Sequence, residues 1–324
     1  MEENIESRII TNQDDKWDAH HGPFEDFSLL KPTHSTLLVQ AVDHWHPKAA
    51  EILEAFRFIP NWRIDDLMIS FSSPKGGVGP HLDQYDVFII QGEGKRHWRV
   101  GMPQPALKEV IPCKSLLQVE NFEACIDVVL EPGDILYIPP GIAHHGTSLD
   151  SECITLSFGY RSYSATEMME VLELKPHKPN NDYYIDPNWL IDIGNSEISN
   201  SAVNQALELL NIDQLPAEFF GCFVTRLDPF DQQKLNEMMA FEEPIEIEES
   251  ASYILSPICR IAYQMIETEL HVFINGESFD TELFDQDLLI RFCNTRMIKI
   301  NHQSTLLAKK LSSLHLIEKI SDHN

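Results

Sequence analysis

The stretch from residue 64 to residue 162 is a succession of short apolar runs separated by Gly and Pro. Each run is rich in β-branched or aromatic residues, which is typical of β-strands. The runs are DDLMISFSS (65–73), YDVFIIQG (85–92), KRHWRVGM (95–102), ACIDVVLEPGDILYIPPG (124–141) and ECITLSFGYRSY (152–163). Strands that follow one another this closely predict an antiparallel β-barrel or sandwich.

The segments on either side of this region have different patterns. Upstream, HSTLLVQAVDHW (34–45) has a strand-like core, and HPKAAEILEAFRFIP (46–60) has helical spacing that Pro60 ends. Downstream, the pattern is helical and amphipathic, with a polar, proline-bearing loop predicted over residues 175–188. The predicted helices are SATEMMEVLELK (164–175), NSAVNQALELLNI (200–212) and DPFDQQKLNEMMAFEE (228–243).

The last part of the chain mixes strands and helices. An acidic stretch, FEEPIEIEES (241–250), is typical of a linker. After it come two strand-like segments, with an Asn275-Gly276 turn in the second, and then two helix-like segments. The four segments are ASYILSPICRIAY (251–263), LHVFINGESF (270–279), TELFDQDLLIRFCN (281–294) and STLLAKKLSSLHLIEKI (304–320).

These patterns together predict three parts. They are a mainly β domain over residues 1–163, an α-helical region over 164–245 and a small α+β, winged-helix-like module over 246–324.

Composition narrows the class of protein. The 324 residues are 43% hydrophobic and 23% charged, as in soluble globular proteins. No apolar run approaches the ~20 residues that span a bilayer, and the acidic start MEENIES does not resemble a signal peptide. The six cysteines form no C-x-x-C pair, so we expect free, buried thiols rather than a zinc ribbon. We therefore expect a cytoplasmic protein that is not associated with a membrane.

The net charge of −27 argues against binding to a nucleic-acid backbone, because such binding depends on Lys and Arg. Two interpretations of the charge stay open. It can serve solubility alone, or it can attract a basic partner.

A candidate metal site begins at His81 and Asp83. Two residues apart on a strand, their side chains would project from the same face. An imidazole and a carboxylate on one face supply two of the three ligands of a site with two His and one carboxylate, which holds iron(II) and leaves coordination positions open.

The third ligand is predicted from EPGDILYIPPGIAHHG (131–146). Gly133, Pro139, Gly141 and His144 have the spacing of the second motif of cupin barrels. The Pro-Pro-Gly sequence would kink the chain so that His144, and not His145, points into the barrel. The sequence therefore predicts a metal site made by His81, Asp83 and His144.

Oxygenases with this ligand set usually use 2-oxoglutarate as co-substrate, and its far carboxylate needs a buried cation. On the strand KRHWRV (95–100), Arg96, Trp98 and Val100 share the face that should be buried. Arg96 is thus the predicted carboxylate partner, since a guanidinium can form a bidentate pair. Hydroxyl groups on neighbouring strands could add hydrogen bonds to the co-substrate: Ser70, Thr155 and Ser157.

These residues make the chain similar to a known family, the JmjC-type ribosomal oxygenases, and in particular to the bacterial ribosomal-protein arginine hydroxylases. The resemblance covers roughly residues 5–165 and is weaker beyond them. The stretches that carry it are LLVQAVDHWH (37–46), WRIDDLMISFSSP (62–74), GPHLDQYDVFIIQGEGKRHWRVG (79–101) and LEPGDILYIPPGIAH (130–144).

The resemblance implies a double-stranded β-helix, or cupin-like, core, a helical dimerisation region that makes a homodimer, and a winged-helix domain. It implies hydroxylation of an arginine side chain in a basic, large-subunit ribosomal protein, with iron(II), 2-oxoglutarate and molecular oxygen. By position, it places the iron ligands on His81, Asp83 and His144 and the co-substrate contacts on Arg96 and Ser70. Family members usually begin well upstream with a Trp-, Phe- and base-rich segment, so it also implies a shortened start.

Other functions stay open at this point. The same chemistry could act on a histidine of a ribosomal protein or on a small molecule, or the barrel could be a non-catalytic, metal-binding interaction module. An inward Arg96 argues against the last, because a module that only binds partners needs no buried carboxylate partner. Tyr85 and Asp86, close to the metal motif in sequence, are candidates to bind the target side chain.

Overall fold

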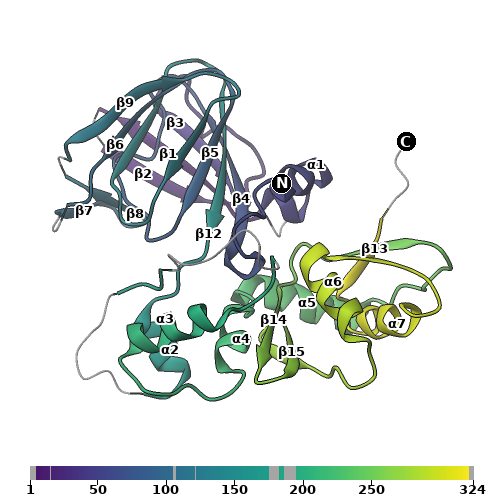
Figure 1. Cartoon of the computed structure of the whole chain (residues 1–324). Helices are drawn as coiled ribbons and strands as arrows, with labels where there is room; N and C mark the ends of the chain where they lie inside the picture. The colour runs from purple at the N-terminus through teal and green to yellow at the C-terminus, as the bar shows by residue number, and fades with distance from the viewer. Residues whose placement is uncertain are drawn as a thin grey trace. The chain divides into compact units, whose positions relative to one another are not determined.

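The computed structural model describes residues 5–14, 16–104, 107–120, 122–174, 182–185 and 195–320. The chain forms two compact units (Figure 1). The first comprises Met1–Phe56 and Ile64–Ser162, and the second comprises Arg57–Arg63 and Tyr163–Asn324.

The first unit is a β-barrel in which all the strand pairs are antiparallel (Figure 1). One wall is a seven-stranded sheet in the order β10-β5-β12-β4-β3-β1-β2, the other is a three-stranded sheet in the order β11-β6-β9, and β7 and β8 form a hairpin. The strands are β1 (Ser7–Gln13), β2 (Lys16–His21), β3 (Ser35–Val39), β4 (Ile64–Ser72), β5 (Val87–Glu93), β6 (Arg96–Gly101), β7 (Glu109–Cys113), β8 (Leu116–Val119), β9 (Ala124–Leu130), β10 (Ile135–Ile138), β11 (His144–Ser148) and β12 (Cys153–Tyr160). The predicted cupin-like core is confirmed.

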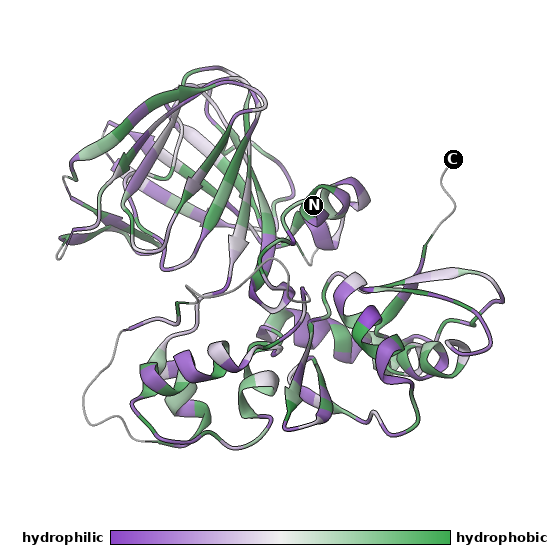
Figure 2. Ribbon diagram, in the orientation of Figure 1, coloured by the Kyte–Doolittle hydropathy of each residue, from purple (hydrophilic) through white to green (hydrophobic). Residues whose placement is uncertain are grey.

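Along the barrel strands, side chains alternate between the interior and the opposite face. On β6, Arg96, Trp98 and Val100 are buried, whereas His97 and Arg99 are half-buried on the opposite face. Figure 2 shows hydrophobic and hydrophilic positions intermixed along the barrel strands. A cluster of buried apolar side chains fills one part of the interior: Val87, Ile89, Trp98, Val100, Leu130, Leu136, Ile138 and Ile142. Full burial of one such side chain contributes about 1.5–3 kcal/mol to folding.

The chain passes from one sheet to the other between β10 and β11. β10 pairs with β5 in the large sheet, and β11 pairs with β6 in the small one. Residues 139–143 make this crossing, and Gly141 adopts a φ of 73°, a conformation that favours glycine. The Pro-Pro-Gly sequence therefore ends one strand and redirects the chain into the opposite wall.

The helix predicted over residues 46–60 is shorter in the structure. After the short 3-10 helix η1 (Val42–His44), α1 spans Pro47–Glu54 and ends well before Pro60. Just after this helix, the ring of Phe56 stacks on Phe158 of the barrel, with ring centroids 3.8 Å apart. Tertiary packing thus overrides the local helical spacing.

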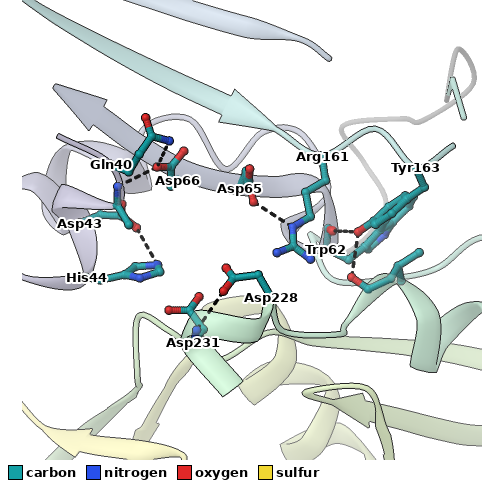
Figure 3. Close-up of polar contacts among 12 residues, drawn as sticks. Gln40, Asp43, His44, Trp62, Asp65, Asp66, Arg161, Tyr163, Asp228 and Asp231 are labelled. Atoms are coloured by element: carbon teal, nitrogen blue, oxygen red, sulfur yellow. Dashed lines mark hydrogen bonds and ion pairs between the residues drawn. The ribbon is translucent and has the colours of Figure 1, made fainter. Parts of the chain in front are cut away.

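The second unit combines helices with two small sheets. Ser164 and Glu167 form a capping box on α2, and the side chain of Asp228 accepts hydrogen bonds from the first turn of α5 (Figure 3). The elements are η2 (Asn61–Arg63), α2 (Ala165–Val171), α3 (Asn200–Leu210), α4 (Phe219–Val224), α5 (Pro229–Phe241), β13 (Ser252–Leu255), β14 (Ile261–Ile266), β15 (Glu269–Ile274), β16 (Glu277–Phe279), α6 (Gln286–Thr295), β17 (Met297–Lys299), α7 (Thr305–Ser313) and β18 (Ile317–Lys319). The three predicted helices of residues 164–243 are present, and α4 is additional.

In the C-terminal part the predicted turn is confirmed, but the predicted strand 251–263 is divided into β13 and β14, and the helix predicted over 304–320 ends at Ser313 and is followed by β18. Asn275 and Gly276 both have positive φ and join β15 to β16. The loop predicted over residues 175–188 lies largely outside the described residues. The division into a helical dimerisation region and a winged-helix-like module stays a prediction.

Two simpler expectations can be compared with the structure. None of the six cysteines forms a disulfide, but only Cys153, Cys259 and Cys293 are buried, so the expectation of buried thiols is wrong for the others. Within the described residues, the helices are all too short or too polar to span a bilayer.

Candidate metal centre

Three potential ligand atoms converge inside the barrel. One atom each from His81, Asp83 and His144 lies within 4.8 Å of the other two. Asp83 Oδ2 is 3.7 Å from His81 Nε2 and 3.6 Å from His144 Nε2, and the two imidazole centroids are 4.2 Å apart. Among the described residues, this is the one such cluster of three or more His, Cys, Asp and Glu side chains.

The backbone that holds His81 and Asp83 differs from the sequence expectation. Neither residue lies in a regular strand, so the premise that strand alternation aligns them is wrong. Gly79, with a φ of 81°, and Pro80 interrupt strand geometry just before them. Instead, His81 and His144 exchange two backbone hydrogen bonds of 3.0 and 2.8 Å, and the carbonyl of Asp83 accepts from Gly141 N at 2.7 Å. The metal motif is thereby fastened to the turn that precedes β11.

Backbone carbonyls fix the tautomers of both histidines. The Nδ1 atom of His81 is 3.0 Å from the carbonyl of Gly79, and that of His144 is 2.9 Å from the carbonyl of Ile142. A carbonyl only accepts, so each Nδ1 carries a hydrogen, and Nε2 is the ring nitrogen left to bind a metal beside Asp83. Burial, together with neighbouring His81, lowers the pKa of His144 to about 4. The donor set therefore fits a site with two neutral imidazoles and one carboxylate.

His145 lies apart from this cluster. Its Nε2 is 3.3 Å from Thr147 Oγ1 on the same strand, and burial lowers its pKa to about 4. Adjacent residues of β11 point to opposite faces, which leaves His144 alone facing the ligand set.

The ligands border a cavity of about 380 Å³ that Arg96 also lines. Arg96 is 5% exposed, its Nη2 donates to Ser72 Oγ at 2.6 Å, and its Nε has no hydrogen-bond partner. Within the described part of the chain, no carboxylate forms an ion pair with it. A buried guanidinium without a counter-charge is costly, so the cavity is suited to an anionic ligand.

The predicted hydroxyl groups line the same cavity. Ser70 and Thr155 are cross-strand partners on β4 and β12, and Ser157 follows two residues later. Thr155 Oγ1 is also 3.5 Å from the side-chain oxygen of Gln91. The structure thus gathers all three hydroxyl groups on the wall of the large sheet.

Of the two candidates for binding the target side chain, one lines the cavity and the other does not. Tyr85 lines the cavity, and partial burial of its side chain, which is 38% exposed, together with Asp83 raises the pKa of its hydroxyl above the usual range. Asp86 does not line the cavity, and its carboxylate accepts a hydrogen bond of 2.6 Å from Tyr137.

Sequence reasoning missed Asp66, which lines the cavity from β4. Its Oδ2 accepts hydrogen bonds from Ala41 N at 2.7 Å and from the side-chain amide of Gln40 at 3.2 Å (Figure 3). Burial, with Asp65 alongside, raises the pKa of Asp66 to about 7. Strand alternation puts Asp66 on the same face as Ser70, and that signal could have found it.

Comparison with family models and curated proteins gives consistent matches. Residues 51–168 match the model of the JmjC domain. The "ribosomal protein uL16 3-hydroxylase" of Escherichia coli K12 is 45% identical over 232 residues, which make up 70% of this chain and 62% of the relative. A "probable ribosomal oxygenase" of Haemophilus influenzae is 39% identical over 172 residues, or 52% of this chain and 42% of the relative. The matched regions thus span less than two thirds of the length of these curated relatives.

Solved structures match over nearly the whole chain. The X-ray structure of E. coli YcfD is 34% identical, with a TM-score of 0.70, and the match covers 98% of this chain and 88% of that one. The structure of YcfD, described as a ribosomal oxygenase, with cobalt and 2-oxoglutarate is 32% identical, with a TM-score of 0.66 and coverage of 99% and 88%.

Proposed function

Because this chain belongs to the JmjC-type ribosomal oxygenases, we propose that it is an iron(II)- and 2-oxoglutarate-dependent oxygenase that hydroxylates an arginine side chain of a large-subunit ribosomal protein. The observation that carries the proposal is the convergence of His81, Asp83 and His144 in one cavity beside the buried Arg96, which has no acidic partner among the described residues.

The three ligands would hold the metal on one side and leave the cavity side open. Iron(II) and 2-oxoglutarate, when bound, let molecular oxygen place one oxygen atom on the substrate carbon and the other in succinate, with release of carbon dioxide. The backbone carbonyls of Gly79 and Ile142 keep both imidazoles oriented for coordination. Cobalt and 2-oxoglutarate in the YcfD structure support this assignment.

Arg96 would bind the far carboxylate of 2-oxoglutarate. The carboxylate would supply the counter-charge that the guanidinium lacks among its described neighbours. Ser70, Thr155 and Ser157 would surround the co-substrate with hydroxyl groups. These side chains orient the co-substrate and exclude water from it.

Asp66 and Tyr85 would bind the target guanidinium. A cation restores the ionised form of a carboxyl group whose pKa burial has raised, so Asp66 favours a basic side chain. The side-chain oxygen of Gln40 is buried without a donor and offers a further acceptor beside it. The target of the E. coli relative, ribosomal protein uL16, and the net charge of −27 support a basic protein as substrate. We also propose that the chain forms a homodimer through residues 164–245 and acts in the cytoplasm.

Mass spectrometry of ribosomal proteins tests the proposal. After incubation of the full chain with iron(II), 2-oxoglutarate and large-subunit proteins, we expect the mass of one added oxygen atom on an arginine, with succinate formed in equal amount. If the added oxygen atom is found on a histidine, the target side chain is histidine and not arginine. If no protein gains oxygen and 2-oxoglutarate is not consumed, the proposed activity is wrong.

Replacement of Asp66 by Asn tests arginine recognition. We expect kcat/KM for the protein substrate to fall about 10- to 100-fold, because an ionised hydrogen-bond acceptor contributes about 1.5–3 kcal/mol. The affinity for 2-oxoglutarate should stay unchanged.

Asp65→Asn is the matched control. Asp65 is next in sequence but exposed, and it accepts from Arg161 Nε at 2.8 Å (Figure 3). If both variants lose activity equally, or if neither does, Asp66 is not the group that recognises the substrate.

A further inference from the structure

We propose that Thr36 donates a hydrogen bond to the far carboxylate of 2-oxoglutarate, and that Ser72 links Thr36 to Arg96. This inference rests on the proposed function and adds a binding group and a positioning group to it. Neither residue was predicted as part of the site.

The three side chains form a continuous chain of hydrogen bonds. Thr36 on β3 and Ser72 on β4 are paired directly across the sheet, and both are completely buried. Arg96 Nη2 is 2.6 Å from Ser72 Oγ, which is 2.9 Å from Thr36 Oγ1. The guanidinium reaches this pair from β6, on the opposite wall of the barrel.

Donor and acceptor chemistry sets the direction of each of these hydrogen bonds. A guanidinium only donates, so Ser72 Oγ accepts from Arg96. The hydroxyl proton of Ser72 then needs an acceptor, and in the described part of the chain Thr36 Oγ1 is the one within hydrogen-bond distance. Ser72 therefore donates to Thr36. The reverse arrangement would leave the Ser72 proton buried without a partner, which is unfavourable.

The position of the cavity then determines where the Thr36 proton points. Thr36 lines the cavity, as Arg96 does, but Ser72 does not. Because the Thr36 oxygen accepts the hydrogen bond from Ser72, the hydroxyl hydrogen of Thr36 remains to be donated. Among the described residues, no other group accepts it. An anion that pairs with Arg96 lies within the same cavity and supplies that acceptor. Donation from Arg96 through Ser72 polarises the Thr36 hydroxyl and strengthens the bond.

Calorimetry on the full chain loaded with Co(II) tests the inference without turnover. We expect Thr36→Val to weaken binding of 2-oxoglutarate about tenfold, or ~1.4 kcal/mol, and Thr36→Ser to bind as the wild type does. Binding of 2-oxopentanoate, which lacks the far carboxylate, should not change in Thr36→Val. Should the Val variant fail to fold, Thr36→Ala carries the same expectation.

Thr11→Val is the matched control, because Thr11 is buried on neighbouring β1 but does not line the cavity. Equal affinity of wild type and Thr36→Val for 2-oxoglutarate would overturn the inference and leave the proposed function intact. An equal loss for 2-oxopentanoate, or in Thr11→Val, would also overturn it. If the wild type itself binds no 2-oxoglutarate, both the inference and the proposed function are wrong.

Discussion

Replacement of His81 by Ala is expected to abolish turnover of 2-oxoglutarate and to weaken metal binding more than a hundredfold. Loss of a group that merely orients a ligand already costs about 10–100-fold in affinity, and His81 is itself one of three predicted ligands. Metal binding can be measured by competition with a chelator, and turnover by the formation of succinate.

His145→Ala is the control for this experiment. His145 is adjacent to His144, but its imidazole lies near Thr147 and outside the cluster. We expect it to retain metal and activity. An active His81→Ala enzyme would refute the assignment of His81 as a ligand. An inactive His145→Ala enzyme would show that His145 belongs to the site and that the assignment of His144 alone is wrong.

Replacement of Arg96 by Met is expected to change ligand affinity and stability in different ways. Binding of 2-oxoglutarate should weaken more than a hundredfold, because removal of one partner of a buried charge pair costs about 3–5 kcal/mol. Without ligand, the free energy of unfolding should stay the same or rise, since the substitution removes a buried cation that has no acidic partner among the described residues. Calorimetry gives the affinity, and urea denaturation gives the stability.

Arg99→Met provides the comparison on the same strand. Arg99 is half-buried on the other face of β6, where Asp127 lies 4.0 Å away. Its replacement should leave the affinity for 2-oxoglutarate unchanged. If Arg96→Met binds 2-oxoglutarate as tightly as the wild type does, Arg96 does not bind the far carboxylate.

Much of the barrel could be predicted because strands have a simple period of two. That period placed Arg96, Trp98 and Val100 together on the buried face of β6, as the structure has them. The β7–β8 hairpin was missed because its strands are short and β7 is largely exposed, so the apolar signal is weak.

The site was predicted partly for a wrong reason. His81 and Asp83 were expected to share a strand face, but their convergence depends on the backbone bonds to His144 and Gly141. Such bonds join segments that are far apart in the sequence, and no local pattern reveals them. Asp66 and Thr36 were missed for a similar reason, since their significance depends on which neighbours line the cavity with them.

The crossing from β10 to β11 also determines when the metal site can form. His81 and Asp83 precede β5, whereas His144 opens β11, so the strands from β5 to β10 lie between the ligands in the chain. An unfolded or partly synthesised chain holds no preformed site, and metal can bind only after the two walls have paired. The metal therefore binds only the folded state. At a free metal concentration a hundred times the dissociation constant, this binding stabilises the folded state by about 2.7 kcal/mol. Withdrawal of iron would then deprive the protein of resistance to unfolding and proteolysis as well as of its chemistry.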